Sequence, residues 1–198
     1  MRGYRGWLVL TVAIVAMNWR AGAAELAWKT LTVRVYDNAD VPKSAVRTAL
    51  EVAAHTLRPA DLDVTWLPCS ASSGGRCTLP LGRGELLVRL VRSPQETGRE
   101  DESLGTALID PASGTGVLAT VYVDRVERLA RGSNGDLGTL LGRAMAHEIA
   151  HLLMGRTAHA GAGLMRPRWT RAEVARNARP DWSLAAGDLR VIRDRRGM

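Results

Sequence analysis

The sequence predicts an α+β fold in which helices pack against a mixed, mostly parallel β-sheet. The first half of the chain alternates strand-like and helix-like segments, beginning with a strand, a helix and a second strand. Such a strand–helix–strand unit is the connection that parallel strands require. The second half is dominated by segments with helical spacing of apolar residues. Strands followed by helices indicate one sheet covered by helices.

The first strand, helix and second strand are expected between residues 31 and 67. Residues 31–36 partly alternate apolar and polar side chains, as a half-buried strand does. Pro42 suits the first turn of a helix, and apolar residues recur at helical spacing over 46–57. Pro59 ends this helix. Residues 62–67 alternate cleanly and form the second strand.

Three further strands and a short helix are expected in the middle of the chain. Residues 85–92 carry apolar side chains on both faces, which indicates a buried strand. A charged loop over 93–103 follows. Residues 104–109 and 118–124 are then two strands joined by a glycine-containing turn, and 125–131 form a short helix.

The longest helix is expected over residues 137–154. It is largely apolar, so it should be buried in the core. Asp136 stands where an N-cap residue would, and Gly155 supplies the glycine that commonly ends a helix. Two C-terminal helices, over 169–179 and 183–196, should pack against the sheet or against this long helix.

The N-terminal residues 1–24 have the pattern of a secretory signal peptide. Two arginines precede a mostly apolar run over 7–17, and small residues follow at 21–24. The run is shorter than the roughly 20 residues that cross a bilayer, so no stable membrane span is expected after cleavage. An uncleaved N-terminal anchor is the alternative. We therefore expect a secreted or periplasmic protein in which residues 25–198 form a single domain.

The basic charge does not indicate a nucleic-acid partner. Without Arg2, Arg5 and Arg20 the formal charge falls from +7 to +4. The other arginines are scattered, with no nucleic-acid motif and no interleaved aromatic residues. They are interpreted as a solvated cationic surface, and a monomer is expected.

Cys69 and Cys77 are the only cysteines. They bracket a loop rich in serine and glycine, residues 70–76. In an exported protein such a close pair predicts a disulfide bond that pins the loop. The alternative is a metal-binding or redox-switch pair.

The segment His147-Glu148-Ile149-Ala150-His151 carries the clearest chemical signal in the chain. Residues four apart on a helix leave the same face about 6 Å apart, a spacing that one Zn²⁺ can bridge. Glu148 points to a neighbouring face, where it can reach water activated by the metal and act as general base. The motif predicts a zinc site on the buried helix.

A catalytic zinc site needs a third protein ligand and one open position. If the chain reverses at Gly155, His159 returns beneath the helix end and completes a three-histidine site. Glu173, on the next predicted helix, is the alternative third ligand. His55 lies in the first helix, far from the motif, and is interpreted as an ordinary helix histidine.

The run HEIAHLLMGRTAHAGAGLM resembles the zinc site of the metzincin metalloproteases, the clan that includes the matrix metalloproteinases. The resemblance implies that His147, His151 and His159 bind Zn²⁺ and that Glu148 is the general base. It also implies that Gly155 reverses the chain, and that Met165 is the methionine of the turn beneath the metal. Gly155 stands one residue later than the metzincin pattern, and His159 two residues later.

The resemblance extends to neighbouring segments. Residues 104–111 and 118–124 are similar to the edge strand and the last strand before the zinc helix of matrix metalloproteinases. A peptide or protein substrate would then pair with the edge strand at 104–109, and residues 166–169 would line the pocket beside the metal. The expected function is an exported zinc endopeptidase. The alternative is an exported binding domain that zinc stabilises without catalysis.

Overall fold

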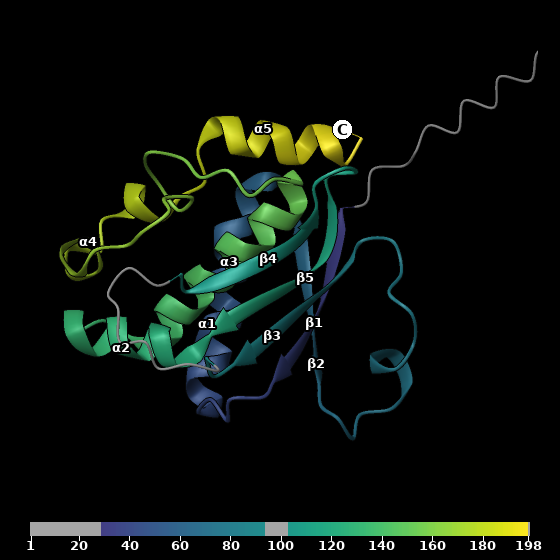
Figure 1. Ribbon diagram of the computed structural model, residues 1–198, viewed down its shortest axis with the longest axis horizontal. Helices are drawn as coiled ribbons and strands as arrows, with labels where there is room; N and C mark the ends of the chain where they lie inside the picture. Colours follow the sequence, from purple (N-terminus) through teal and green to yellow (C-terminus); the bar gives the residue numbers. More distant parts are fainter. Residues whose placement is uncertain (1–28, 94–102, 198) are drawn as a thin grey trace, which may run out of the picture.

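The structure is a computed structural model, and it describes residues 29–93 and 103–197 (Figure 1). The signal peptide expected over 1–24 lies outside the described residues, as does most of the loop expected over 93–103. Among the described residues, no helix combines the length and the apolar character that a membrane span requires.

One five-stranded sheet forms the centre of the molecule, with the strand order β2-β1-β3-β5-β4. Its strands are β1 (Thr30–Asp37), β2 (Asp63–Cys69), β3 (Glu85–Val91), β4 (Gly105–Asp110) and β5 (Thr115–Tyr122). Strands β2, β1, β3 and β5 are parallel neighbours, and β4 pairs antiparallel with β5 at the edge. The mixed, mostly parallel sheet predicted from the sequence is confirmed.

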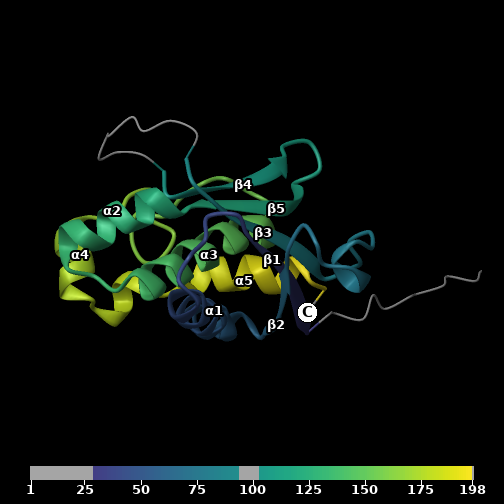
Figure 2. The same ribbon diagram turned by 90° about the horizontal axis from the view of Figure 1, so that it is seen from below.

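Two long helices lie side by side against one face of the sheet (Figure 2). The α-helices of the described residues are α1 (Lys43–Leu57), α2 (Val123–Ser133), α3 (Leu137–Met154), α4 (Arg171–Arg176) and α5 (Ala186–Arg195). Short 3₁₀ turns occur at Arg58–Ala60, Gly75–Cys77 and Arg179–Trp182. The long helices α1 and α3 pack together, α5 packs on α3, and α4 packs on α2.

Close packing between α1 and α3 explains the two glycines within α3. A Cβ on Gly138 would lie 2.7 Å from Cβ of Thr48, and one on Gly142 would lie 2.5 Å from the carbonyl oxygen of Ala49. A helix-interior glycine costs roughly 0.5–1 kcal/mol relative to alanine. Here the cost is offset by the close approach of two backbones, which buries α3 between α1 and the sheet.

The C-terminal helices are shorter than the sequence predicts. The segment expected to be helical over 169–179 holds only α4, because Thr170 caps its start and Asn177, in the left-handed conformation at φ 49°, ends it. The segment expected over 183–196 holds α5, which begins at Ala186. Helix α5 packs on α3, as predicted, whereas α4 packs on α2 instead.

The segment between β2 and β3 covers part of the other sheet face. Cys69 and Cys77 are joined by a disulfide, as the sequence predicts. The Tyr36 hydroxyl on β1 donates to the carbonyl of Cys77, and the buried Arg34 guanidinium donates to the carbonyl of Leu79. The disulfide therefore holds a loop that β1 also binds.

Candidate metal centre

Helix α3 places His147, Glu148 and His151 in the protein interior. Its N-terminus is fixed by Asp136, whose carboxylate accepts a hydrogen bond of 2.7 Å from the Thr139 amide. All three motif side chains are buried. The helix that carries the motif is thus anchored at its start and covered along its length.

Gly155 ends α3 and turns the chain back toward the helix. It adopts φ 63°, a left-handed conformation that glycine takes without strain. The Arg156 amide donates back to the His151 carbonyl, which closes the turn. This reversal brings His159 beside the two helix histidines, even though the loop is longer than the metzincin pattern.

One ring nitrogen from each of the three histidines lies within 4.8 Å of the other two. The His151 Nε2 lies 3.0 Å from the His147 Nε2 and 3.3 Å from the His159 Nε2. Bonds of about 2.0–2.1 Å in tetrahedral geometry would separate two nitrogen ligands by about 3.3 Å. The spacing therefore suits one small cation, and these histidines form a group that could hold a metal ion.

Backbone carbonyls orient two of the rings. The His147 Nδ1 lies 2.9 Å from the Leu164 carbonyl oxygen, and the His151 Nδ1 lies 2.8 Å from the Arg156 carbonyl oxygen. A carbonyl only accepts, so each Nδ1 carries the proton and each Nε2 presents a lone pair to the cluster. Lone pairs facing one another at 3.0 Å repel, and a cation between them removes that cost.

The histidines are held in the neutral form that binds metal. Burial, with smaller contributions from the neighbouring His151 and His159, lowers the pKa of His147 to about 4. Burial also lowers the pKa values of His151 and His159. Protons therefore compete poorly for these nitrogens near neutral pH.

Glu148 lies next to the cluster, against the edge strand β4. Its side chain is buried, and burial raises the pKa of its carboxyl to about 8. A cation at the histidine cluster would favour the ionised form instead. Gly105 on β4 lies so close that a Cβ there would be 2.7 Å from the Glu148 Oε1.

The alternative third ligand, Glu173, does not join the cluster. Its carboxylate accepts from the Thr170 amide and hydroxyl in a capping box at the start of α4, and it pairs with Arg166. His55 lies exposed on α1, as predicted. Met165 is 1% exposed, and its carbonyl accepts from the Ala160 amide, which steadies the segment that carries His159.

The turn after α3 is clamped by α5 and by the β4–β5 connection. Arg156, whose carbonyl orients His151, forms an ion pair of 2.9 Å with the buried Asp188 on α5. Arg195 on α5 donates to the Gly114 carbonyl, and Gly155 packs against Gly114. The sequence gives no signal for this clamp, because it joins segments far apart in the chain.

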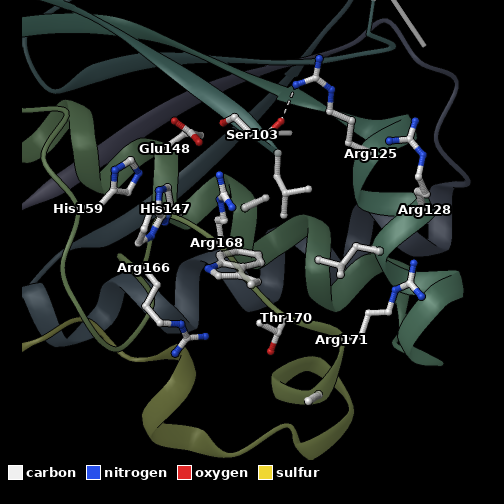
Figure 3. A pocket seen from close by; sticks show the side chains of 16 residues that line it. Ser103, Arg125, Arg128, His147, Glu148, His159, Arg166, Arg168, Thr170 and Arg171 are labelled. Atoms are coloured by element: carbon white, nitrogen blue, oxygen red, sulfur yellow. Dashed lines mark hydrogen bonds between the residues drawn. The ribbon is translucent and has the colours of Figure 1, made fainter. Parts of the chain in front are cut away.

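A cavity of about 650 Å³ opens beside the histidines (Figure 3). Residues 166–169 line it, as the resemblance implied. Arg125 and Arg128 on α2 and Arg171 at the start of α4 also line it. The tertiary fold therefore gathers part of the scattered arginines around one cavity.

The fold and the site together combine a mixed sheet with a three-histidine cluster formed by a buried helix and the loop after it. Among solved structures the fold is similar to that of archaemetzincin from Methanopyrus kandleri, with a TM-score of 0.53 and 13% sequence identity. The match covers 84% of this chain and 96% of that protein. No protein-family model and no curated protein sequence matches the chain.

Proposed function

We propose that this protein is an exported zinc endopeptidase. The observation that carries the proposal is the convergence of three histidine nitrogens beside a buried carboxyl group at the edge of the sheet. The fold supports it, since it is similar to that of archaemetzincin, with a TM-score of 0.53. Peptide hydrolysis needs these groups together: a metal, a base and a place for an extended substrate.

His147, His151 and His159 would hold the metal. Three imidazole ligands with one position left open are typical of a catalytic zinc site. When bound, zinc would supply Lewis acidity that lowers the pKa of water and polarises a carbonyl oxygen. The Leu164 and Arg156 carbonyls keep two of the rings in the binding orientation, and Met165 is proposed as the buried methionine of the turn below them.

Glu148 would move the proton. As a carboxylate it accepts a proton from the attacking water, whose oxygen forms a bond to the peptide carbonyl carbon. The carbon–nitrogen bond then breaks, and Glu148 delivers the same proton to the leaving amine. Its burial beneath β4 keeps bulk water away from this proton.

Strand β4 would hold the substrate backbone. It is an edge strand, and Leu108 on it is 66% exposed. An extended peptide can add to such an edge through main-chain hydrogen bonds. Ala107→Pro should reduce peptide turnover more than zinc content, and equal loss of both would count against this placement.

The remaining features of the proposal concern export and partners. Residues 1–24 would be a cleaved signal peptide and residues 25–198 the catalytic domain, in a secreted or periplasmic monomer that binds no nucleic acid. The disulfide between Cys69 and Cys77 supports an oxidising compartment. Mass spectrometry of the exported protein would locate the mature N-terminus.

The decisive variant for the enzymatic proposal is Glu148→Gln, compared with the wild-type protein. We expect the variant to keep zinc and to lose peptide hydrolysis by at least about 100-fold, as expected for loss of a general base. A wild-type protein that binds zinc but hydrolyses no peptide would instead be the zinc-stabilised binding domain. The comparison uses the mature protein. Peptide hydrolysis is measured with a pool of quenched fluorescent peptides, and the zinc content is measured by metal analysis.

A further inference from the structure

The outer edge of β4 presents the main-chain groups of alternate residues. In an antiparallel pair, residues opposite one another alternate between pairs that hydrogen-bond to each other and pairs that do not. The Tyr122 amide donates to the Leu104 carbonyl at 2.9 Å, so these two residues form a bonded pair where β4 begins. Gly105 lies one residue further along and Ala107 three residues further. The amides and carbonyls of both therefore face away from β5, at the edge of the sheet.

The outward-facing groups of Gly105 already have a partner within the chain. The Ser103 hydroxyl donates to the Gly105 carbonyl oxygen, and the Gly105 amide donates to the same hydroxyl at 3.4 Å. The Arg125 guanidinium donates to the Ser103 carbonyl at 2.7 Å and holds Ser103 at the start of the strand. A peptide that approaches this edge therefore finds both main-chain groups of Gly105 in use.

This contact lies where a substrate would meet the proposed base. Gly105 packs against Glu148, since a Cβ at position 105 would be 2.7 Å from the Glu148 Oε1. Ser103 and Glu148 line the same cavity (Figure 3). Residues of an extended strand rise about 3.4 Å each, so the outward groups of Ala107 lie about 7 Å from those of Gly105. Which of the two residues binds the substrate thus decides where the substrate backbone lies relative to Glu148.

We propose that Ser103 is a positioning residue whose hydroxyl blocks the main chain of Gly105, so that a peptide substrate hydrogen-bonds to the main chain of Ala107 and not to Gly105. The inference rests on the proposed function, because it concerns how the substrate of the same site is held. A peptide amide can bind the Gly105 carbonyl only by displacing a hydrogen bond that is already made, and such an exchange yields little net free energy. Within residues 29–93 and 103–197, no side chain hydrogen-bonds the main chain of Ala107.

The test is an ester scan of the substrate main chain. In each peptide one amide other than the scissile bond is replaced by an ester, which removes a single N–H donor. The parent peptide is the member of a fluorescent pool that Glu148→Gln, supplied with zinc, binds most tightly. The wild-type protein and Ser103→Ala report kcat and KM. The same pair in the Glu148→Gln background reports Kd by fluorescence anisotropy without cleavage.

With Ser103 present, we expect an ester effect at the amide that donates to the Ala107 carbonyl, about fivefold on Kd and on KM, the equivalent of one net hydrogen bond. Ser103→Ala frees the Gly105 carbonyl. A second amide, two residues away along the substrate, should then become sensitive by a similar factor, and the parent peptide should bind about fivefold more tightly.

Two further variants separate positioning from a merely structural role. Ser103→Thr keeps a hydroxyl and should restore the wild-type pattern of ester effects. Ser72→Ala, in the loop that the disulfide holds, should leave the pattern unchanged. A structural role for Ser103 would weaken the binding of all peptides alike and would add no sensitive amide. Circular dichroism and zinc content establish that each variant is folded.

The outcomes distinguish this inference from the proposed function. The same ester pattern with and without the Ser103 hydroxyl, in a protein that cleaves the parent peptide, would overturn the inference and leave the peptidase intact. The expected pattern in binding, with no cleavage by the wild-type protein, would support the inference and contradict the peptidase. A protein that binds no peptide of the pool would contradict both.

Discussion

Gly105 on β4 lies directly against Glu148 on α3, and no larger residue fits between strand and carboxyl group. A Cβ at position 105 would lie 2.7 Å from both Cγ and Oε1 of Glu148 and 2.7 Å from the Thr120 carbonyl oxygen. Real Cβ atoms do not approach other atoms so closely. The edge strand proposed to bind substrate is therefore also the surface that positions the proposed base.

Gly105→Ala should displace Glu148 and lower peptide turnover while the zinc content stays near one per chain. We expect a loss of at least about tenfold in kcat/KM, since misplacing a catalytic group by about 1 Å can cost as much as 100-fold. Gly187→Ala on α5 is the matched control, because a Cβ there meets nothing within 4 Å. Wild-type turnover in Gly105→Ala would contradict the proposed role of this contact.

Asp188→Asn should weaken zinc binding although Asp188 lies outside the cluster. The variant loses the ion pair to Arg156, whose carbonyl orients the His151 ring. Outer partners of metal ligands typically contribute 10- to 100-fold in affinity, and we expect about tenfold here. Competition with a fluorescent chelator measures the affinity. Asp194→Asn, at an exposed position on the same helix, should leave it unchanged.

In the metal-free protein, the contribution of His147 to stability should fall as pH drops below about 6.5. Burial holds the pKa of folded His147 at about 4, whereas the unfolded chain takes up its proton near the ordinary value of about 6.5. Between these values the unfolded state binds more protons, so acid favours unfolding by on the order of 2 kcal/mol. Urea denaturation with chelator at pH 7 and pH 5 measures this. The change from pH 7 to pH 5 should be less unfavourable for His147→Gln than for the wild-type protein, and an equal response of the two proteins would contradict the explanation.

Glu148→Gln should stabilise the metal-free protein near pH 8. Burial raises the pKa of folded Glu148 to about 8, so from about 4.5 upward the unfolded chain releases a proton that the folded chain keeps. Stability is therefore lost as pH rises through this range, and glutamine removes that loss, by on the order of 2 kcal/mol. Thermal unfolding of both proteins with chelator at pH 5 and pH 8 tests this. Equal effects at the two pH values would show that ionisation is not the cause.

The helix that carries the site was predictable to its ends, because its signals are local. The Asp136 cap, the apolar run and Gly155 are all readable in the sequence, and α3 spans Leu137–Met154 as expected. The mixed sheet followed from the same kind of pattern. Local signals also misled: helical spacing over 169–179 did not show that Asn177 would end α4 early.

The surroundings of the site depend on contacts between distant segments, which one sequence does not display. Spacing alone left His159 and Glu173 as rivals, and only the fold brings His159 to the cluster while Glu173 caps α4. The arginines of α2 and of the segment after Met165 lie about 40 residues apart in sequence, yet line one cavity. The contact between Gly105 and Glu148 is likewise tertiary.

The most direct measurement for the central claim is the metal content of the mature protein and of His159→Ala, with His55→Ala as the control. We expect one zinc per chain in the wild-type protein and in the control, and a loss of at least about tenfold in zinc affinity in His159→Ala, because one of three ligands is removed. A wild-type protein without stoichiometric metal, or a His159→Ala variant that binds zinc like the wild type, would contradict it.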